Sequence, residues 1–393
     1  MKRRLQVAIV GGAGHIGAPL GIVLANRDMD VVLYDRNKSA LESIARGRLP
    51  FLEKKGDSGL RAALRTGCLR VSAHIDALCR VDAAILTIGT PVDAYQNPRW
   101  SPLTECIDEV AAVLPRSAAI VLRSTISPGT TEFIDRHLRL RNLHFPLAFC
   151  PERVTQGNAL EEITALPQIV SGTSPRAVRI AERIFGRIAP SLVRMEPREA
   201  ELAKLVCNAF RYMLFAATNQ LHMLVESQGI DYAGLLRKAK QGYPRLGYLP
   251  GAGFAAGPCL MKDTMQLFAH NNLLFNMGHA AMLVNEGLPD FVVGQLAQSL
   301  ALPKATVGVL GVTFKAESDD IRDSLAFKLI KILKFRGARV VCSDEYFKHP
   351  DHVSKEALVA CSDAVIIGAP HRAYRRLAFP KGKKVVDIWG ILH

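Results

Sequence analysis

Residues 5–35 read LQVAIVGGAGHIGAPLGIVLANRDMDVVLYD, and this stretch predicts the fold of the N-terminal part of the chain. The apolar run Leu5–Val10 ends in glycines, as a buried strand does before a tight turn. A helical pattern follows over Ile16–Asn26, and Val31–Tyr34 predicts a second strand that ends at Asp35. A strand, a glycine-rich turn, a helix and a strand in this order predict the first unit of a doubly wound parallel sheet.

The turn between the first predicted strand and helix contains the pattern G-x-G-x-x-G, which comprises Gly12, Gly14, His15, Ile16 and Gly17. The first glycine permits the tight turn, the second lets the backbone approach a pyrophosphate, and the third lets helix and strand pack closely. Amide groups at the start of the helix would face the phosphates. A glycine turn without a ligand is the alternative, but the flanking strand and helix favour a dinucleotide site.

The end of the second predicted strand bears on which dinucleotide binds. Asp35 is placed to accept hydrogen bonds from the ribose hydroxyls, which favours NAD. Arg36 follows directly, and an arginine at this position can accept the 2′-phosphate of NADP. We therefore predict NAD as the cofactor, with NADP left open by Arg36.

Alternating strand and helix patterns continue to about residue 198, with strand-like runs at Ala83–Ile88, Ala118–Leu122 and, more weakly, Ile169–Ser171. Near residue 304 the first pattern returns, as VGVLGVTF, a helix over Leu325–Phe335, and ARVVCSD. This predicts two Rossmann-like α/β domains, at residues 1–198 and 301–393. The second lacks the G-x-G-x-x-G turn, so it could hold a nucleotide without being the main dinucleotide site.

A single long helix is predicted between these domains, over Glu199–Gln228, because the segment has no Pro or Gly and its apolar residues recur at helical spacing. An ordinary core helix is the alternative. We expect instead that this helix contributes to a homodimer interface, since its apolar residues cover several faces. Residues 199–300 are thus predicted to form a small, helical dimerisation region.

Composition limits the partners of the 393-residue chain. With 49% hydrophobic and 22% charged residues it is typical of a globular protein. The net charge of +14 comes from dispersed residues without a nucleic-acid-binding signature, so we expect an anionic small substrate rather than DNA or RNA, an unspecific basic surface being the alternative. Polar residues interrupt the longest apolar stretch, 209–225, which argues against a membrane span. The eight cysteines lack metal-binding spacing, which predicts no metal site and, without a secretion signal, reduced thiols in the cytoplasm.

The segment RLGYLPGAGFAAGPCLMKD, residues 245–263, contains the most reactive group predicted. Cys259 precedes Lys262 and Asp263 by three and four residues. A thiol beside a cation can become a nucleophilic thiolate, and a carboxylate one turn away can act as a base. A buried structural cysteine is the alternative.

Other polar residues cluster on the long helix and at predicted strand ends. Glu201, Lys204 and Asn208 share one helix face, which is either a solvated edge or the lining of a site. A lysine and an amide together can stabilise an oxyanion. The pairs Thr90-Pro91 and Ser124-Thr125 and the triplet 150–152 follow apolar runs, and strand ends are where ligands bind in such sheets.

Eight motifs, in order, resemble those of the UDP-glucose/GDP-mannose dehydrogenase family: GAGHIG, the TP pair at Thr90, STISPGTT, CPERV, the Glu201/Lys204/Asn208 helix, PRLG, CLMKDT and GVTFKAESDDIRDS. The resemblance implies an NAD-dependent nucleotide-sugar 6-dehydrogenase. Cys259 would form a thiohemiacetal with the sugar aldehyde, its oxidation would give a thioester, and water would release the uronate.

The resemblance also implies roles for individual residues. Lys204 and Asn208 would stabilise oxyanions, Asp263 and Thr125 would position water or transfer protons, and Glu152 would support the base. The residues expected around the cofactor, besides the glycine turn, Asp35 and Arg36, are Thr90, Thr125, Lys262 and Arg322. Those expected to hold the nucleotide sugar are Glu152, Lys204, Asn208, Arg245, Gly253, Phe254, Phe314 and Lys315.

The sequence departs from the family pattern in the loop before Cys259, at Gln156, and at Gln220, which stands where an acid often follows the helix asparagine. Ala255-Ala256 stands where the family usually has a glycine pair, and Gln156 where relatives often carry a second acid. The substrate stays open between UDP-glucose, which CLMKDT resembles, and a UDP-N-acetylhexosamine, which CPERV and STISPGTT resemble. Two other functions also stay open: a two-electron hydroxyacid dehydrogenase that needs no thiol, and a protein that binds nucleotide sugar without turnover.

Overall fold

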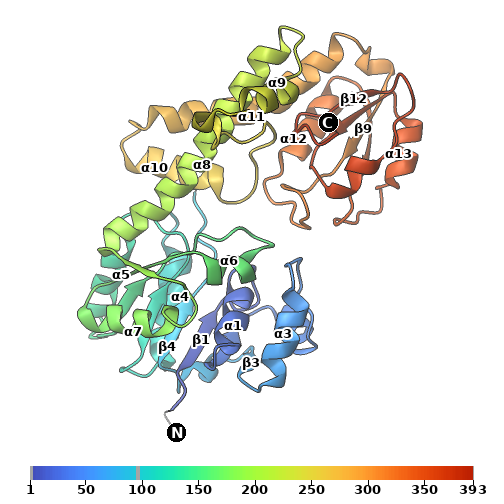
Figure 1. Cartoon of the computed structure of the whole chain (residues 1–393). Helices are drawn as coiled ribbons and strands as arrows, with labels where there is room; N and C mark the ends of the chain where they lie inside the picture. Colours follow the sequence, from blue (N-terminus) through green and yellow to red (C-terminus); the bar gives the residue numbers. More distant parts are fainter. Residues whose placement is uncertain (1–2, 94–97, 393) are drawn as a thin grey trace. The chain divides into compact units, whose positions relative to one another are not determined.

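The computed structural model describes residues 3–93 and 98–392, and the chain divides into two compact units, Met1–Val206 and Cys207–His393. Each unit has its own sheet, and helix α8 (Pro197–Glu226) runs from the first unit into the second (Figure 1). The helix begins and ends two residues before the predicted positions. The division into three domains at residues 198 and 300 stays a prediction.

The sheet of the first unit has the strand order β3-β2-β1-β4-β5-β6-β7-β8. Its strands are β1 (Gln6–Val10), β2 (Asp30–Tyr34), β3 (Leu69–Ser72), β4 (Ala83–Leu86), β5 (Ala119–Leu122), β6 (Leu147–Phe149), β7 (Gln168–Gly172) and β8 (Leu192–Arg194). All neighbours are parallel except β6 and β7, which pair antiparallel. The order confirms the predicted doubly wound arrangement, and the point where it reverses, between β1 and β4, is where such sheets bind dinucleotides.

Helices cover both faces of this sheet. Alternate residues of β1 point to opposite faces, so that Val7 and Ile9 lie in one apolar cluster while Ala8 and Val10 lie in another. The first cluster includes residues of α1 (Gly17–Ala25), α2 (Lys38–Ala45), α3 (Gly56–Arg65), α6 (Ala159–Ala165) and α7 (Pro175–Phe185). The second includes residues of α4 (Ser101–Val113) and α5 (Thr130–Arg139).

The second unit combines a smaller α/β sheet with a helical segment. Its sheet has the order β10-β9-β11-β12 and is parallel throughout. The strands are β9 (Thr306–Leu310), β10 (Arg339–Ser343), β11 (Ala364–Ile367) and β12 (Lys384–Val386). One face packs against α12 (Leu325–Phe335) and α11 (Asn276–Ala297), and the other against α13 (Lys355–Cys361). The predicted second Rossmann-like pattern is therefore present.

The remaining helices of the second unit are α9 (Tyr232–Ala239) and α10 (Leu260–His270). Within residues 3–93 and 98–392, no helix is long and apolar enough to cross a membrane.

Candidate functional site

The glycine turn after β1 leaves room for a ligand at one glycine and none at the other two. A Cβ on Gly12 would lie 2.8 Å from the Leu33 Cα, and a Cβ on Gly17 would lie 2.4 Å from the Gly11 oxygen. A Cβ on Gly14 would meet only the Gly11 oxygen, at 3.4 Å. In α1, which begins at Gly17, the Ala18 amide already donates to the Gly14 carbonyl and Pro19 has no amide hydrogen, so it is the turn itself that faces phosphate oxygens. The turn thus fits the pyrophosphate of a dinucleotide.

His15, within this turn, lies beside two other side chains of the first unit. Its ring centroid lies 4.1 Å from that of Phe51, and Gln156 Nε2 lies 3.2 Å from its Nδ1. Gln156 therefore contacts the glycine turn.

Asp35 and Arg36 line a cavity of about 260 Å³ beside the turn, together with Tyr34, Ile88, Pro102 and Glu109 among others. Asp35 accepts hydrogen bonds from the amides of Ala13, at 3.0 Å, and Asn37, at 2.9 Å. One bond to each oxygen leaves acceptor capacity for ribose hydroxyls. Arg36 Nη2 lies 2.5 Å from Glu109 Oε2, and this hydrogen bond raises the pKa of Arg36.

The strand-end residues Thr90 and Thr125 come together as predicted by their positions after β4 and β5. Thr90 Oγ1 donates to the Thr125 carbonyl at 2.6 Å. The neighbouring Ser124 hydroxyl donates to the Ile88 carbonyl at 2.6 Å. These bonds join two adjacent loops at the carboxyl edge of the sheet, where ligands bind in α/β proteins.

Glu152 and Lys204 form a buried ion pair in the first unit. The Lys204 Nζ lies 3.0 Å from Glu152 Oε1, and the side chains are only 6% and 12% exposed. The other carboxylate oxygen accepts the Val154 amide at 2.8 Å. Lys204 is therefore no solvated surface lysine, and the pair places a proton donor and a proton acceptor in contact.

Glu201 serves neither as a solvated edge nor as part of this ion pair. Its carboxylate accepts the amides of Gly129, at 2.6 Å, and Thr131, at 2.7 Å, as well as the Thr131 hydroxyl. It thereby caps the start of α5 and fixes the STISPGTT loop against α8. The shared helix face did not indicate this role.

In the second unit, Cys259 lies at the N-terminal end of α10 and is exposed. One turn later the buried Asp263 accepts a hydrogen bond from Asn208 Nδ2 at 2.6 Å, and its other oxygen lies 3.4 Å from Lys262 Nζ. A thiol at a helix N-terminus experiences the positive end of the helix dipole. The structure therefore brings together three of the residues predicted around the thiol, Asn208, Lys262 and Asp263.

The loop before Cys259 is held by two buried asparagines and two aromatic rings. Asn219 donates to the Gly253 carbonyl and accepts its amide, both at 2.9 Å, and Asn285 accepts a hydrogen bond from Asn219. A Cβ on Gly253 would lie 2.2 Å from the Trp389 ring, and a Cβ on Gly257 2.5 Å from Phe314. The sequence pattern did not indicate the asparagine clamp.

Four further residues that were predicted to bind the cofactor or the nucleotide sugar lie in the second unit. Phe254 is 4% exposed and packs edge-on against Trp389, so its side chain is not accessible to a ligand. Arg245 is exposed, and Lys315 Nζ lies 5.8 Å above the Phe314 ring. Arg322 forms a bidentate pair with Asp320, at 2.6–3.0 Å. This hydrogen bonding raises the pKa of Arg322, to which the charge of Cys259 also contributes.

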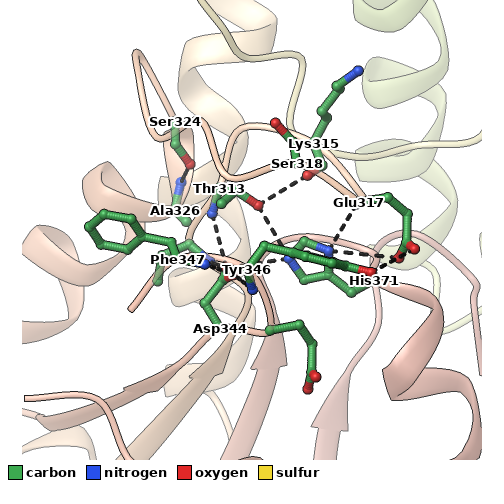
Figure 2. Close-up of polar contacts among 12 residues, drawn as sticks. Thr313, Lys315, Glu317, Ser318, Ser324, Ala326, Asp344, Tyr346, Phe347 and His371 are labelled. Carbon is green, nitrogen blue, oxygen red and sulfur yellow. Dashed lines mark hydrogen bonds and ion pairs between the residues drawn. The ribbon is translucent and has the colours of Figure 1, made fainter. Parts of the chain in front are cut away.

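A buried polar cluster closes the carboxyl edge of the second sheet. Figure 2 shows His371 among Thr313, Glu317 and Asp344. His371 Nδ1 accepts the Glu317 amide at 3.0 Å, which assigns the proton to Nε2, 3.3 Å from Asp344 Oδ2. Burial opposes ionisation of Asp344, but hydrogen bonds from His371 and from backbone amides lower its pKa to about 2. In the described part of the chain, no group of three or more His, Cys, Asp or Glu side chains could hold a metal ion.

Comparisons with known proteins identify relatives along most of the chain. Three domains of the UDP-glucose/GDP-mannose dehydrogenase family match the chain: the NAD-binding domain over residues 5–189, the central domain over 198–286 and the UDP-binding domain over 308–393.

Individual relatives match over nearly the whole chain. A UDP-N-acetyl-D-mannosamine dehydrogenase of Pyrococcus horikoshii is 30% identical over 94% of this chain and 90% of its own. An NDP-N-acetyl-D-galactosaminuronic acid dehydrogenase of Ralstonia nicotianae is 28% identical over 97% and 95%. The structure of a UDP-glucose dehydrogenase from Pyrobaculum islandicum is similar with a TM-score of 0.90 and 26% identity, over 98% and 94%.

Proposed function

This chain belongs to the UDP-glucose/GDP-mannose dehydrogenase family, and on that premise we propose that it oxidises the C6 hydroxyl of a UDP-hexose to the carboxylate in two NAD-linked steps. Membership makes it an NAD-dependent nucleotide-sugar dehydrogenase. The observation that supports the four-electron reaction most is the exposed Cys259 one turn before the buried Asp263, which Asn208 and Lys262 both contact.

The cofactor would lie against the glycine turn, with its adenosine ribose at Asp35. Gly14 leaves open backbone for the pyrophosphate, and Asp35 retains acceptor capacity for the ribose hydroxyls. NAD supplies the hydride acceptor for each oxidation. The Glu109 carboxylate forms an ion pair with the guanidinium of Arg36, which would otherwise be available to the 2′-phosphate of NADP. This ion pair supports a preference for NAD over NADP. Thr90 and Thr125, and Lys262 and Arg322 in the second unit, are the further candidate contacts.

In the first oxidation, Glu152 would take the proton of the C6 hydroxyl, directly or through water, as a hydride leaves C6. Lys204 would stabilise the negative charge that develops on that oxygen. The contact between Lys204 and Glu152 supports both roles, because it holds a carboxylate and a hydrogen-bond donor at one place. Both residues would therefore touch the substrate.

In the second oxidation, the Cys259 thiolate would add to the aldehyde carbon, and the oxygen would gain a proton to give the thiohemiacetal. Loss of that proton and of a hydride from C6 would give the thioester, and water would then break the C–S bond, releasing the uronate and the thiol. Asn208 would stabilise the oxyanions, and Asp263 would orient or deprotonate water.

The names of the relatives favour a UDP-N-acetylhexosamine as the first substrate to test, with UDP-glucose as the alternative. The second unit would hold the nucleotide through Arg245, Lys315, Phe314 and the Gly253–Phe254 backbone. We also propose that the protein is located in the cytoplasm.

We also propose a homodimer built on α8. Phe210, Leu221 and Leu224 fall on one stripe of this helix and are 55%, 42% and 60% exposed. Large apolar side chains exposed in a stripe are typical of an interface. Sedimentation at micromolar concentration should show a dimer that Phe210→Glu dissociates, and a fully active monomer would contradict it.

The test of the function is turnover. Purified protein, NAD and a panel of UDP-sugars should yield NADH and, by mass spectrometry, the uronate of one sugar. Cys259→Ser should stop the second oxidation, because an ester is harder to form and hydrolyse than a thioester. Full uronate production by this variant would exclude the covalent route, and the absence of NADH with every sugar would indicate a binding protein.

A further inference from the structure

Arg123, directly after β5, carries a charge in the interior of the first unit. It is 2% exposed, and its guanidinium carbon lies 5.1 Å from the centroid of the Phe185 ring. Within residues 3–93 and 98–392 no carboxylate comes within the 4.0 Å of an ion pair. A buried charge without a directly bonded carboxylate is costly, so its hydrogen bonds must offset much of that cost.

Those hydrogen bonds all lead to the turn that carries Glu152. Arg123 Nη1 donates to the Cys150 carbonyl and to Gln168 Oε1, both at 3.0 Å. Gln168 Nε2 in turn donates to the Pro151 carbonyl at 2.9 Å. The two carbonyls that precede Glu152 are therefore fixed by one arginine and one glutamine.

The charge of Arg123 also acts on this turn. Burial lowers the pKa of Arg123, and the negative charge of Glu152 opposes that shift. Glu152 thus has two positive side chains near it, Lys204 in direct contact and Arg123 farther away.

We propose that Arg123 is a positioning residue for the Glu152–Lys204 pair. Together with Gln168 it fixes the turn that delivers the Glu152 carboxylate to Lys204. The inference rests on the proposed function in assigning the base role to Glu152, but the positional part of it does not depend on turnover.

The charge and the geometry of Arg123 can be separated by three variants. Arg123→Met removes both, Arg123→Lys keeps the charge without the planar fork, and Gln168→Met keeps the charge but loses the bond to Pro151. Arg116→Met is the matched control, because Arg116 also lies over an aromatic ring, 5.4 Å from Phe145, but is exposed.

Arg123→Met should lower kcat about 100-fold, the contribution expected of a positioned base, with NAD affinity within about twofold of wild type. Arg123→Lys and Gln168→Met should each lower kcat as well, because each loses part of the hydrogen bonding that holds the two carbonyls before Glu152. Arg116→Met should match wild type.

A folded Arg123→Met variant with unchanged kcat would overturn the proposal. If that variant does not fold, unchanged kcat in the folded Arg123→Lys and Gln168→Met variants would overturn the proposal. Crystal structures of the folded Arg123 and Gln168 variants should show that the 3.0 Å contact between Lys204 Nζ and Glu152 Oε1 is broken. An intact contact would contradict the positioning role of Arg123. If wild type oxidises no UDP-sugar, the proposed function fails, whereas this structural comparison still tests the inference.

Discussion

The turns after β1 and after β9 have the same construction, but only the first keeps its aspartate accessible. Gly11 and Gly311 have φ angles of 80° and 86°, and their amides donate to the last residue of the next strand at 3.0 and 2.8 Å. In both turns an aspartate that directly follows that strand accepts an amide of the turn, from Ala13 to Asp35 and from Val312 to Asp344, at 3.0 and 2.7 Å.

The difference lies in what else reaches the two carboxylates. Asp35 accepts one more amide and lines an open cavity, whereas the fully buried Asp344 also accepts the amides of Tyr346 and Phe347 and contacts His371. The same local geometry therefore serves a ligand in one unit and the protein's own loops in the other. An aspartate at a second strand end predicts a ribose site only when the following loop does not enclose it.

The largest expected effect is on the stability of the second unit. Asp344→Ala should lower its free energy of unfolding by about 3–5 kcal/mol, because several buried donors lose their acceptor. Asp35→Ala should lower that of the first unit by only about 1 kcal/mol. Urea unfolding can separate the units by fluorescence, since the two tryptophans, Trp100 and Trp389, lie one in each. Equal losses of unfolding free energy in the two variants would contradict the difference between the two aspartates.

The next effect is the acid sensitivity of the second unit. The pKa of Asp344 is lowered to about 2 from the ordinary 3.8, so its stabilisation is present above the ordinary value and is lost as pH falls toward the lowered one. The shift corresponds to roughly 2 kcal/mol. The stability difference between wild type and Asp344→Asn should therefore shrink by that amount from neutral pH to about pH 2. A constant difference would show that the pKa of Asp344 is not lowered in the folded state.

A smaller effect is expected on cofactor binding. Asp35→Ala should lower kcat/KM for NAD by roughly 10-fold, because a hydrogen bond to a charged group contributes roughly 1.5 kcal/mol. Asp344→Asn, where it folds, should leave NAD affinity unchanged. A similar loss in both variants, measured by NADH formation and by direct binding, would place NAD at both units.

The smallest effect concerns discrimination between the two dinucleotides. Glu109→Gln should release Arg36 and raise kcat/KM for NADP by about fivefold, since exposed ion pairs contribute at most about 1 kcal/mol. Glu105→Gln, at the same cavity, is the control. An equal gain in both variants would mean that net charge, rather than Arg36, sets the preference.

Local patterns predicted much of this fold. The strands at 6–10, 30–34, 83–86 and 119–122 were predictable from apolar runs that end in turn residues. The second α/β sheet was predictable because its sequence pattern resembles that of residues 5–35. The motif around Cys259 also predicted its neighbours Lys262 and Asp263, because these lie within one turn of a helix.

Features that depend on distant partners could not be predicted. The short strand β6 pairs antiparallel with β7, a choice that three residues do not encode. Arg123 is indistinguishable in sequence from a solvated strand-end arginine until Gln168 and Cys150 are placed beside it. Glu201 likewise gains its role from an α5 start some seventy residues earlier, and Asp344 from a histidine after β11.

The most direct test of the account is the number of NADH formed per nucleotide sugar consumed. A limiting amount of the preferred UDP-sugar, excess NAD and wild-type enzyme should give two NADH and one uronate per sugar, because the Cys259 adduct carries the aldehyde into a second oxidation. One NADH per sugar, with the aldehyde or a ketone as the final product, would contradict the covalent mechanism and indicate a two-electron dehydrogenase.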